Sequence, residues 1–306
     1  MKLRNKLILS CAALAAVATT AFSTTFAWYT ANDTVKATGI TGKTSENDAT
    51  LLLISRTAKV GSWGASVEVD SSAVTLEPVA YDDGAYYPWV SNTNTVDTNA
   101  ASGGLTASDD YISFYLYFKS GSSEDLTVKI ASFDLVNTDA EDLPTFSVLA
   151  AGTGVTASTY SVNMFRALDV AITVEQGTEV ASTGTSPVIQ SGSRTVYNCD
   201  ALASGDNVVV NSANAHTYYN NVKSLSGDDA IDDTKVASET TYTSIETLQS
   251  GDYQFTATTG AGNSGNLDSI LMVRFDIYLD GWDKMCFDAV RKQAFTLDME
   301  FAAVTD

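Results

Sequence analysis

Residues 267–301 read LDSILMVRFDIYLDGWDKMCFDAVRKQAFTLDMEF, and the alternation in this stretch decides the fold class. The stretch holds two runs in which every second residue is apolar. One face of the first run carries Val273, Phe275, Ile277 and Leu279, and one face of the second carries Phe295, Leu297, Met299 and Phe301. Because side chains along a strand point alternately to opposite faces, each run is predicted to be a strand with one buried and one solvated face. We expect the two strands to form a terminal hairpin that holds the fold.

The insert between these two strands carries the best helical signal in the chain. Asp283 can cap a helix over residues 283–291, and Arg291 and Lys292 fall near its end, where cations suit the helix dipole. The sequence therefore predicts a short helix between the last two strands.

Shorter β-prone runs and polar segments make up the rest of the chain. Residues 111–118 are apolar or aromatic on both faces, so we expect a central strand that pairs with residues 126–130. The turn signal at residues 82–84 favours a hairpin. Residues 91–110 are expected to be an exposed loop, and the region around 178–250 is expected to be a polar surface insertion.

Together these features predict an all-β protein. The expected fold is a jelly-roll-like β-sandwich with a short helix between the last two strands and long polar loops. We divide the chain into a leader at residues 1–27, an N-terminal extension at 28–43 and a single sandwich domain at 44–306.

The first 27 residues have the layout of a secretory signal peptide. Lys2, Arg4 and Lys6 precede an apolar centre at residues 7–17, and the leader ends at Ala27. The apolar part is too short to span a membrane. We therefore expect a secreted protein, in the extracellular matrix or on the cell surface, with no membrane span after cleavage. The alternative is an uncleaved N-terminal anchor.

The charge balance excludes some partners. The chain has 37 acidic and 17 basic residues, and its formal net charge is −20. Because there is no basic excess to bind a polyanion, we expect no binding to nucleic acid or to acidic lipid surfaces.

The residues that catalysis requires are scarce. His216 is the one histidine, and it lies in a polar stretch. A zinc protease of the paired-histidine type needs two histidines on one helix, and serine or cysteine triads need a base close to the nucleophile. No glycine-rich run matches a phosphate loop. We expect no enzymatic activity.

Two sets of residues are candidate ligand sites. Paired aspartates offer hard oxygen ligands for calcium, although no spacing follows the twelve-residue calcium loop; they are Asp82, Asp83, Asp228, Asp229, Asp232 and Asp233. We expect no cofactor apart from calcium. Several aromatic residues form either a sugar-stacking face or ordinary core and rim; they are Trp63, Tyr81, Tyr86, Tyr87 and Trp89.

Two cysteines remain after the leader, in which Cys11 lies. Cys199 and Cys286 either form a disulfide in an oxidising exterior or remain as two buried thiols. A chain of this length can fold without a disulfide, which favours the thiols.

The junction after the leader carries a family resemblance. The sequence FAWYTAND at residues 26–33, followed by Thr38-Gly39-Ile40, resembles the processing region of the TasA and camelysin family of biofilm-matrix fibre proteins of Gram-positive bacteria. The resemblance implies a jelly-roll subunit, release by a dedicated signal peptidase, and a homopolymer in which the freed N-terminus is donated as a strand to the next subunit's sheet. The assembly strand would then comprise residues 28–43, with Trp28, Tyr29, Val35 and Ile40 as its apolar points. Ala31 departs from the pattern, because an acid is usual there.

Two functions follow as hypotheses. The first is a secreted structural protein that assembles into matrix fibres or a surface layer by strand donation. The alternative is a cell-surface binding module or adhesin for glycan or calcium.

Overall fold

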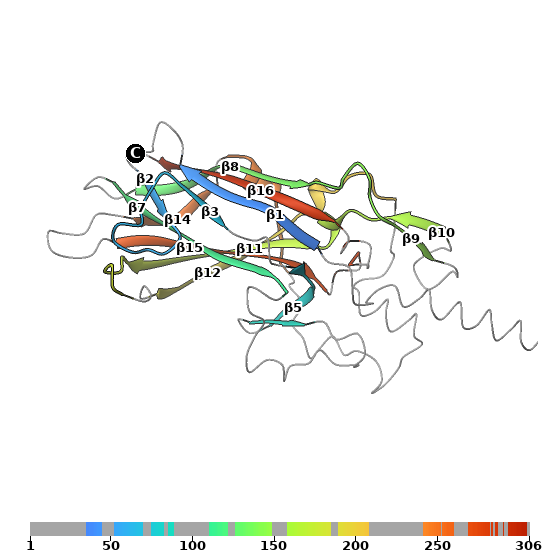
Figure 1. Ribbon diagram of the computed structural model, residues 1–306, viewed down its shortest axis with the longest axis horizontal. Coiled ribbons are helices and arrows are strands. Elements are labelled where there is room, and N and C mark those ends of the chain that lie inside the picture. Colours follow the sequence, from blue (N-terminus) through green and yellow to red (C-terminus); the bar gives the residue numbers. More distant parts are fainter. Residues whose placement is uncertain are drawn as a thin grey trace, which may run out of the picture.

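The structure is a computed structural model whose described residues form a β-sandwich. These residues are 35–44, 52–69, 75–82, 85–88, 110–121, 126–148, 158–184, 189–207, 241–251, 253–259, 269–281, 283, 285, 286, 290 and 293–304. Most of them lie in strands, which form two mixed sheets packed face to face (Figure 1). The predicted all-β class and sandwich architecture are confirmed. The strand order does not establish a jelly-roll topology, which stays a prediction.

The first sheet contains the C-terminal strand. On one side β16 (Ala294–Val304) pairs antiparallel with β8 (Leu126–Asn137), and on the other it pairs parallel with β1 (Val35–Thr44). The outer strands are β14 (Gln254–Thr259) beside β8, with β3 (Ser66–Val69) and β4 (Thr75–Leu76) beside β1.

The second sheet is built around β15 (Ser269–Asp280). On one side β15 pairs along its length with β11 (Leu168–Thr178), and its other side is shared by β7 (Ile112–Ser120) and β5 (Pro78–Asp82). The outer strands are β12 (Ile189–Asn198) and β13 (Thr243–Ser244) beyond β11, β2 (Leu52–Ser55) beyond β7, and β6 (Ala85–Pro88) beyond β5.

Short elements complete the described fold. A separate two-stranded hairpin joins β9 (Thr145–Val148) to β10 (Ser158–Ser161). The 3₁₀ turns η2 (Met164–Arg166) and η3 (Asp200–Leu202) flank the long β11–β12 pair, and α3 (Glu246–Gln249) is a single helical turn.

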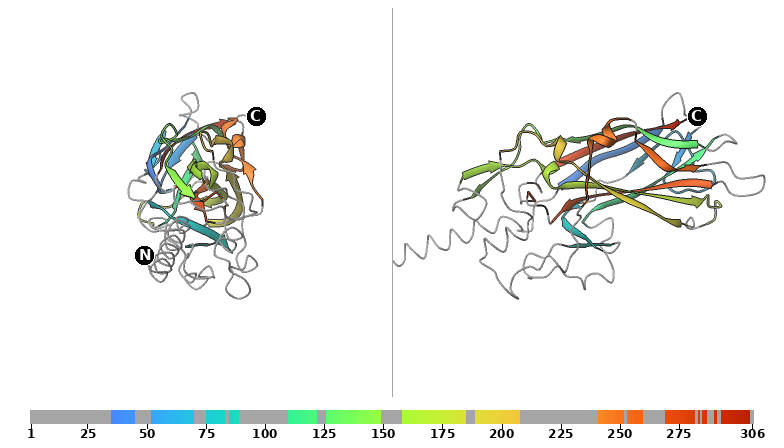
Figure 2. Two further views of the ribbon diagram at one scale, coloured as in Figure 1. Left: turned by 90° about the vertical axis from the view of Figure 1, so that its right-hand side faces the viewer. Right: turned by 180° about the vertical axis from the view of Figure 1, so that it is seen from behind.

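Figure 2 shows the two sheets from the end and from behind. The hydrophobic core fills the space between them. Phe118 of β7, Phe275 of β15 and Phe301 of β16 are all fully buried. The ring centroids of Phe118 and Phe301 lie 4.7 Å apart across the interface, and those of Phe275 and Phe301 lie 6.5 Å apart. Aromatic side chains therefore bridge the layers close to the middle of the sandwich.

The last two long strands lie in opposite sheets, so the expected terminal hairpin is wrong. The faces predicted to be apolar are buried in both strands, and they face each other across the core. A period-two pattern indicates which face is buried, but it does not indicate which strand lies alongside. The chain therefore crosses from one sheet to the other between Asp280 and Ala294.

The helix expected at residues 283–291 lies largely outside the described residues. Asp283 is described, and its carboxylate Oδ1 accepts a hydrogen bond from the backbone N–H of Met285 at 2.6 Å. An N-cap side chain accepts a hydrogen bond from the backbone in the same way, as the sequence predicts for Asp283.

The partner predicted for the strand at residues 111–118 is also wrong. The central position is confirmed, because β7 has a neighbour on each side, but these neighbours are β15 and β2. Residues 126–130 begin β8, which belongs to the other sheet. A short polar connection can cross the edge of a sandwich as well as close a hairpin, and sequence alone does not distinguish the two. The hairpin signal at residues 82–84 is confirmed, since Asp82 pairs with Ala85.

The region expected to be a polar insertion, residues 178–250, contains a sheet strand. β12 pairs with β11 from Asn198 back to Ile189, and Val196 and Tyr197 are buried. The sequence does not predict β12 as a strand because most of its residues are small and polar. A strand toward the edge of a sheet needs few apolar side chains.

The outer face of β15 is buried, although its polar residues predicted solvent exposure. Asp276 and Tyr278 are each 1% exposed. The β5–β6 hairpin supplies the cover, because Tyr86 packs on Tyr278 with ring centroids 4.9 Å apart. The two strands of this hairpin lie far from β15 in the sequence, so the alternation within β15 carries no sign of them.

Gly192 is the point at which β12 approaches β11 most closely. The register shifts between Val174 and Gln176, so β12 carries one extra residue opposite this step. A Cβ on residue 192 would lie 1.7 Å from the carbonyl oxygen of Val174. Only glycine therefore fits at this bulge without a movement of the backbone.

We expect Gly192→Ala to lower the free energy of unfolding by about 2–3 kcal/mol, because the new methyl group must push the β11 backbone away. Urea denaturation followed by circular dichroism measures the change. Gly64→Ala is the matched control, since the nearest atom to its added Cβ lies 3.8 Å away. Equal stability of the two variants would contradict the bulge assignment.

Candidate functional site

The segment proposed for assembly lies inside the sheet of its own chain. β1 pairs parallel with β16 from Lys36 to Thr44, and antiparallel with β3 from Ile40 to Lys43. Val35, one of the expected apolar points, pairs with Leu76 of β4. Residues 35–43 thus form an interior strand of the first sheet in this structure. Trp28 and Tyr29 lie outside the described residues.

Among the side chains of β1 that the structure describes, at positions 40, 41, 42 and 44, one is large and apolar. Ile40 is fully buried, and Gly42 and Thr44 follow it on the same face. A Cβ on Gly42 would sit in ordinary contact with Leu116 and Ile54 of the second sheet, at 3.5 and 3.6 Å. Burying one isoleucine contributes about 1.5–3 kcal/mol. Backbone pairing with β16 on one edge and with β3 and β4 on the other adds to this side-chain contact.

The neighbours of β1 depend on it to different degrees. β16 also pairs antiparallel with β8 from Phe295 to Val304, a pairing that does not involve β1. Among the described strands, β3 and β4 pair with β1 alone. β1 therefore occupies a slot between a firmly held strand, β16, and two short strands that it fixes in place.

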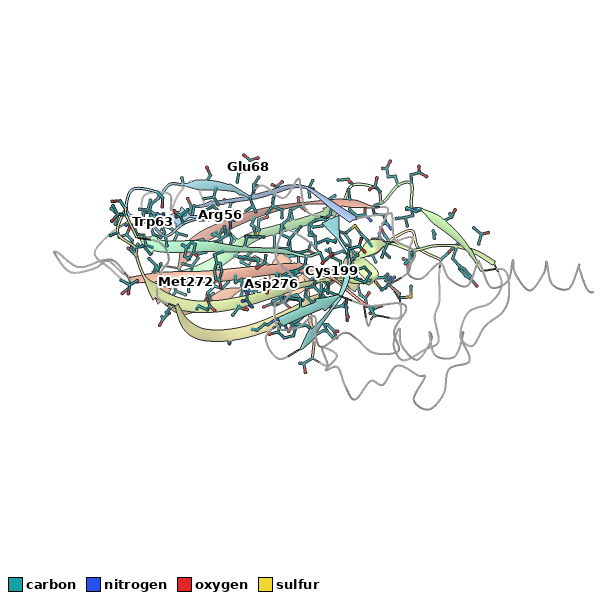
Figure 3. The ribbon with its side chains drawn as sticks, turned by 60° about the horizontal axis from the view of Figure 1, so that its bottom comes forward. Arg56, Trp63, Glu68, Cys199, Met272 and Asp276 are labelled. Carbon is teal, nitrogen blue, oxygen red and sulfur yellow. The ribbon has the colours of Figure 1, made fainter. Side chains whose placement is uncertain are left out.

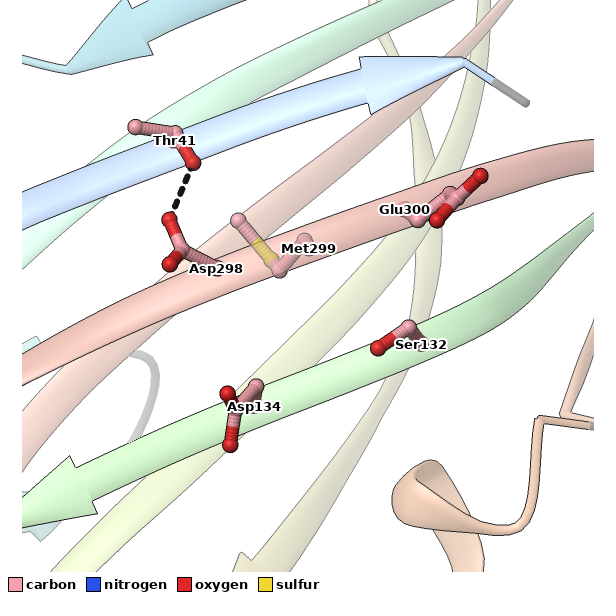
Figure 4. A pocket seen from close by; sticks show the side chains of 6 residues that line it. All are labelled: Thr41, Ser132, Asp134, Asp298, Met299 and Glu300. Carbon is pink, nitrogen blue, oxygen red and sulfur yellow. Dashed lines mark hydrogen bonds between the residues drawn. The ribbon is translucent and has the colours of Figure 1, made fainter. Parts of the chain in front are cut away.

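A hollow lies on the outer face, over the seam between β1 and β16 (Figure 4). Its volume is ≈ 310 Å³, and its lining consists of Thr41, Ser132, Asp134, Asp298, Met299 and Glu300. The Thr41 hydroxyl donates a hydrogen bond to Asp298, which links β1 to β16 through side chains as well as backbone. Asp298 stands opposite Asp134 of β8, and Thr41 stands opposite Glu68 of β3. A row rich in carboxylates therefore crosses the sheet at the candidate strand.

A cluster of buried amides fixes the start of β16, where β1 also begins. Gln293, Asn137 and Asn163 are 1%, 5% and 1% exposed. The Asn137 amide donates to Oε1 of Gln293 at 2.7 Å and to Oδ1 of Asn163 at 3.1 Å. The Gln293 amide donates to the carbonyl of Val162 at 2.9 Å, and its Oε1 accepts from the backbone N–H of Met164 at 3.0 Å. The cluster ties β8, β16 and the start of η2 together.

No sequence pattern predicts this cluster. Three amides scattered over more than 150 residues of chain have no spacing rule, and each alone is typical of a surface loop. Only the fold brings them to one end of the sandwich.

A second polar cluster lies on the outer face of the other sheet. The Arg194 guanidinium stacks over the Tyr81 ring at 3.6 Å and donates to the Tyr86 hydroxyl at 3.1 Å. That hydroxyl in turn donates to Asp276 Oδ2 at 3.3 Å. Arg274 Nε lies 3.1 Å from the same oxygen. In the sequence, Arg274 and Asp276 alternate with apolar residues, a pattern that predicts a solvated face and not a buried cluster.

Burial governs the ionisation of this cluster. It raises the pKa of the Asp276 carboxyl, and the Arg274 guanidinium opposes the rise. It also raises the pKa of the Tyr86 phenol, so that Tyr86 remains a hydrogen-bond donor at neutral pH.

The aromatic residues considered as one sugar-stacking face belong to separate places. Tyr81 and Tyr86 pack together in the hairpin cover, with ring centroids 5.0 Å apart. Trp63 lies toward the other end of the sheet, where its indole N–H donates to Glu179 and Lys119 lies over its ring at 4.9 Å (Figure 3). Trp89 lies outside the described residues, and Tyr87 is a backbone member of β6.

The calcium candidates fall mostly outside the described residues. These are Asp83, Asp228, Asp229, Asp232 and Asp233, together with the lone histidine, His216. Asp82 ends β5. Within the described ranges, no three His, Cys, Asp or Glu side chains gather as metal ligands.

Cys199 and Cys286 are both buried thiols in the same core cluster, and no disulfide joins them. Burial raises the pKa of the Cys199 thiol. A protonated, buried thiol is unreactive, so Cys199 serves as a small core residue.

No protein-family model, no curated protein and no solved structure matches this chain. Among the described residues, no helix has the length and apolarity that crossing a membrane requires.

The buried amides should matter for stability. We expect Gln293→Ala to lower the free energy of unfolding by about 3 kcal/mol, because it leaves several buried hydrogen-bond partners unsatisfied. Urea denaturation measures the change, with Gln249→Ala on the exposed side of α3 as control. A loss no larger than that of the control would show that the cluster does not hold the start of β16.

Asp276 should give a distinct pH dependence. Its pKa in the folded protein is raised above the unfolded value of about 3.9, so folding favours the protonated form. The stability that this group contributes is present below that pH and is lost as the pH rises through the folded pKa. We expect the stability of Asp276→Asn relative to the wild type to increase over this window and to level off above it. Thermal unfolding between pH 3.5 and pH 8 checks this. A difference that is constant with pH would contradict the prediction.

Proposed function

We propose that this protein is a secreted structural subunit that forms fibres or a surface layer when the N-terminal strand of one copy enters the sheet of the next. The supporting observation is the position of β1. It is an interior strand near the N-terminal end of the chain, paired through its backbone on both edges, and Ile40 is the one large apolar side chain among those described in it. The same ladder accepts the same strand from another copy, because backbone pairing does not depend on which chain supplies it.

Exchange of β1 between copies would conserve every contact that the single chain makes. The monomer in which β1 pairs with its own sheet is favoured over the exchanged form, because a strand on the same chain is present at a high effective concentration. Assembly therefore requires β1 to leave its own slot and a neighbour to supply the replacement, as in domain swapping. The small side chains at Gly42 and Thr44 keep the cost of leaving low.

The leader fits the same proposal. Removal of residues 1–27 by signal peptidase would free the segment that starts at Trp28, seven residues ahead of β1. The role that we propose is structural, without catalysis or a cofactor, and the location is the extracellular matrix or the cell surface. N-terminal sequencing of the exported protein would identify the cleavage position.

A reversible latch between β1 and β16 tests strand exchange. Thr41 and Asp298 are exposed, pair in register and touch through their side chains, so cysteines at both positions are suitably placed to form a disulfide. We expect oxidised monomeric Thr41→Cys/Asp298→Cys protein to remain folded and to form no filaments by electron microscopy. Reduction should restore assembly. Oxidation after assembly should instead give covalent multimers on a denaturing gel, because each new disulfide would then join two chains.

The single variant Thr41→Cys is the control for the effect of the substitution itself. Filaments formed by fully latched monomers would rule out exchange of β1 while leaving other modes of assembly open. Filaments that yield only monomers after oxidation would lead to the same conclusion. Circular dichroism and the free energy of unfolding show whether the latched monomer retains the sandwich, so a failure to fold cannot be mistaken for a failure to exchange.

A further inference from the structure

A strip of polar and aromatic side chains, partly buried, lies on the outer face of the second sheet between two aromatic covers. The β5–β6 hairpin covers one end through Tyr81 and Tyr86, and the segment around Trp63 covers the other. The strip between them, called here the polar strip, comprises Tyr115, Tyr117, Thr173, Glu175 and Arg274. Figure 3 shows this face, with Met272 and Asp276 marking the strand that runs beneath it.

The strand register places these side chains in two adjacent rows. Thr173 of β11 pairs with Arg274 of β15, which pairs with Tyr115 of β7. One step along, Glu175 lies on β11 and Tyr117 on β7, on either side of the fully buried Met272. Hydrogen-bonding groups thus lie beside aromatic rings on one continuous piece of sheet.

The polar strip contains hydrogen-bonding capacity that the described residues leave unused. Thr173 Oγ1 and Glu175 Oε2 are buried atoms without a hydrogen-bond partner among the described residues, whereas Arg274 Nε already takes part in the ion pair with Asp276. Thr173 is only 6% exposed, so bulk water reaches it poorly. Buried polar atoms are nearly always satisfied in folded proteins, so two such exceptions on the same face of β11 point to a ligand.

The rings beside these atoms offer a flat apolar contact. Tyr115 and Tyr117 are stacked, with centroids 5.7 Å apart and planes at 19°. Tyr115 is half-buried, so part of its ring remains accessible. Burial raises the pKa of Tyr115 and raises that of Tyr117 to about 12, so both phenols keep their protons at neutral pH and act as donors.

The charges around the polar strip restrict the class of ligand. Glu175 and Asp276, with a net charge of −20 on the chain, disfavour an anion. Arg274, Arg194 and Arg56 disfavour a cation. An apolar ligand would leave the buried polar atoms unsatisfied. A neutral polyhydroxylated ring remains, since its hydroxyls accept from a guanidinium and donate to a carboxylate while its C–H face lies on a tyrosine ring.

We propose that the polar strip binds a neutral sugar residue of a glycan chain. Arg274, Glu175 and Thr173 would bind the hydroxyl groups, and Tyr115 would contact the ring face. This inference is independent of strand exchange, because the polar strip and β1 lie on different sheets. In a fibre, every subunit would then present a glycan site.

The test is calorimetric titration of purified monomeric protein with three neutral hexasaccharides: maltohexaose, cellohexaose and chitohexaose. We expect saturable binding of at least one, with Kd in the range of about 0.1–5 mM that a single small site provides. Absence of saturable binding of all three by folded wild-type protein at about 10 mM would overturn the proposal.

Two variants separate a binding role from a structural one. Thr173→Val removes the buried hydroxyl but keeps the shape, so it should raise the melting temperature while weakening binding about tenfold. Glu175→Gln should also weaken binding. Val136→Ala, on the exposed face of β8 in the other sheet, is the matched control and should bind as the wild type does.

Unchanged affinity in both polar-strip variants would overturn the assignment of the site even if a sugar binds elsewhere. Repeating the titration on the oxidised Thr41→Cys/Asp298→Cys monomer keeps the two proposals distinguishable. Sugar binding by this latched monomer should match that of the wild type, whether or not the wild type assembles into filaments.

Discussion

The contact of Phe301 with Phe118 and Phe275 across the core is the interaction on which the rest of the sandwich depends. It joins β16 of the first sheet to β15 and β7 of the second sheet. The layers can approach to this distance only if both strands present apolar rows inward, and they do so along their whole length. All other strands are then added outward from these two, β11 and β7 beside β15, and β8 and β1 beside β16.

This arrangement gives the two sheets different outer faces. On the β16 side the outer face is acidic and open, with Asp134 and Asp298 in a row beside β1. On the β15 side the outer face is partly covered by the β5–β6 hairpin, and it is held by an arginine, tyrosines and a buried carboxylate. The first face therefore borders the strand proposed for assembly, and the second carries the strip proposed for a ligand. The two roles can act in one molecule without competing for surface.

The sequence predicted the local properties of the fold better than its neighbour relations. Alternation in residues 267–301 predicts both terminal strands and the side chains that they bury, because the period-two pattern depends only on residues within each strand. It could not show that β15 and β16 lie in opposite sheets, since that depends on every strand between them. Asp276 was expected in solvent because the cover over it comes from Tyr86, 190 residues earlier. The strip of Tyr115, Thr173 and Arg274 likewise draws on three strands that no single window contains. Ile40 stood out as an apolar point in a polar segment, whereas its place between β16 and β3 required the whole fold.

The parallel alignment of β1 with β16 has a geometric consequence for any assembly that uses it. Donation uses two different surfaces of each subunit, a strand and a slot, so successive subunits repeat head to tail, and parallel pairing with β16 sets the direction in which each incoming strand runs. Such a filament has two chemically different ends. One end exposes an empty slot beside β16, and the other exposes an unused strand. Growth at the two ends would therefore have different rates, and a cell could start or stop a filament with a second protein that supplies only a slot or only a strand.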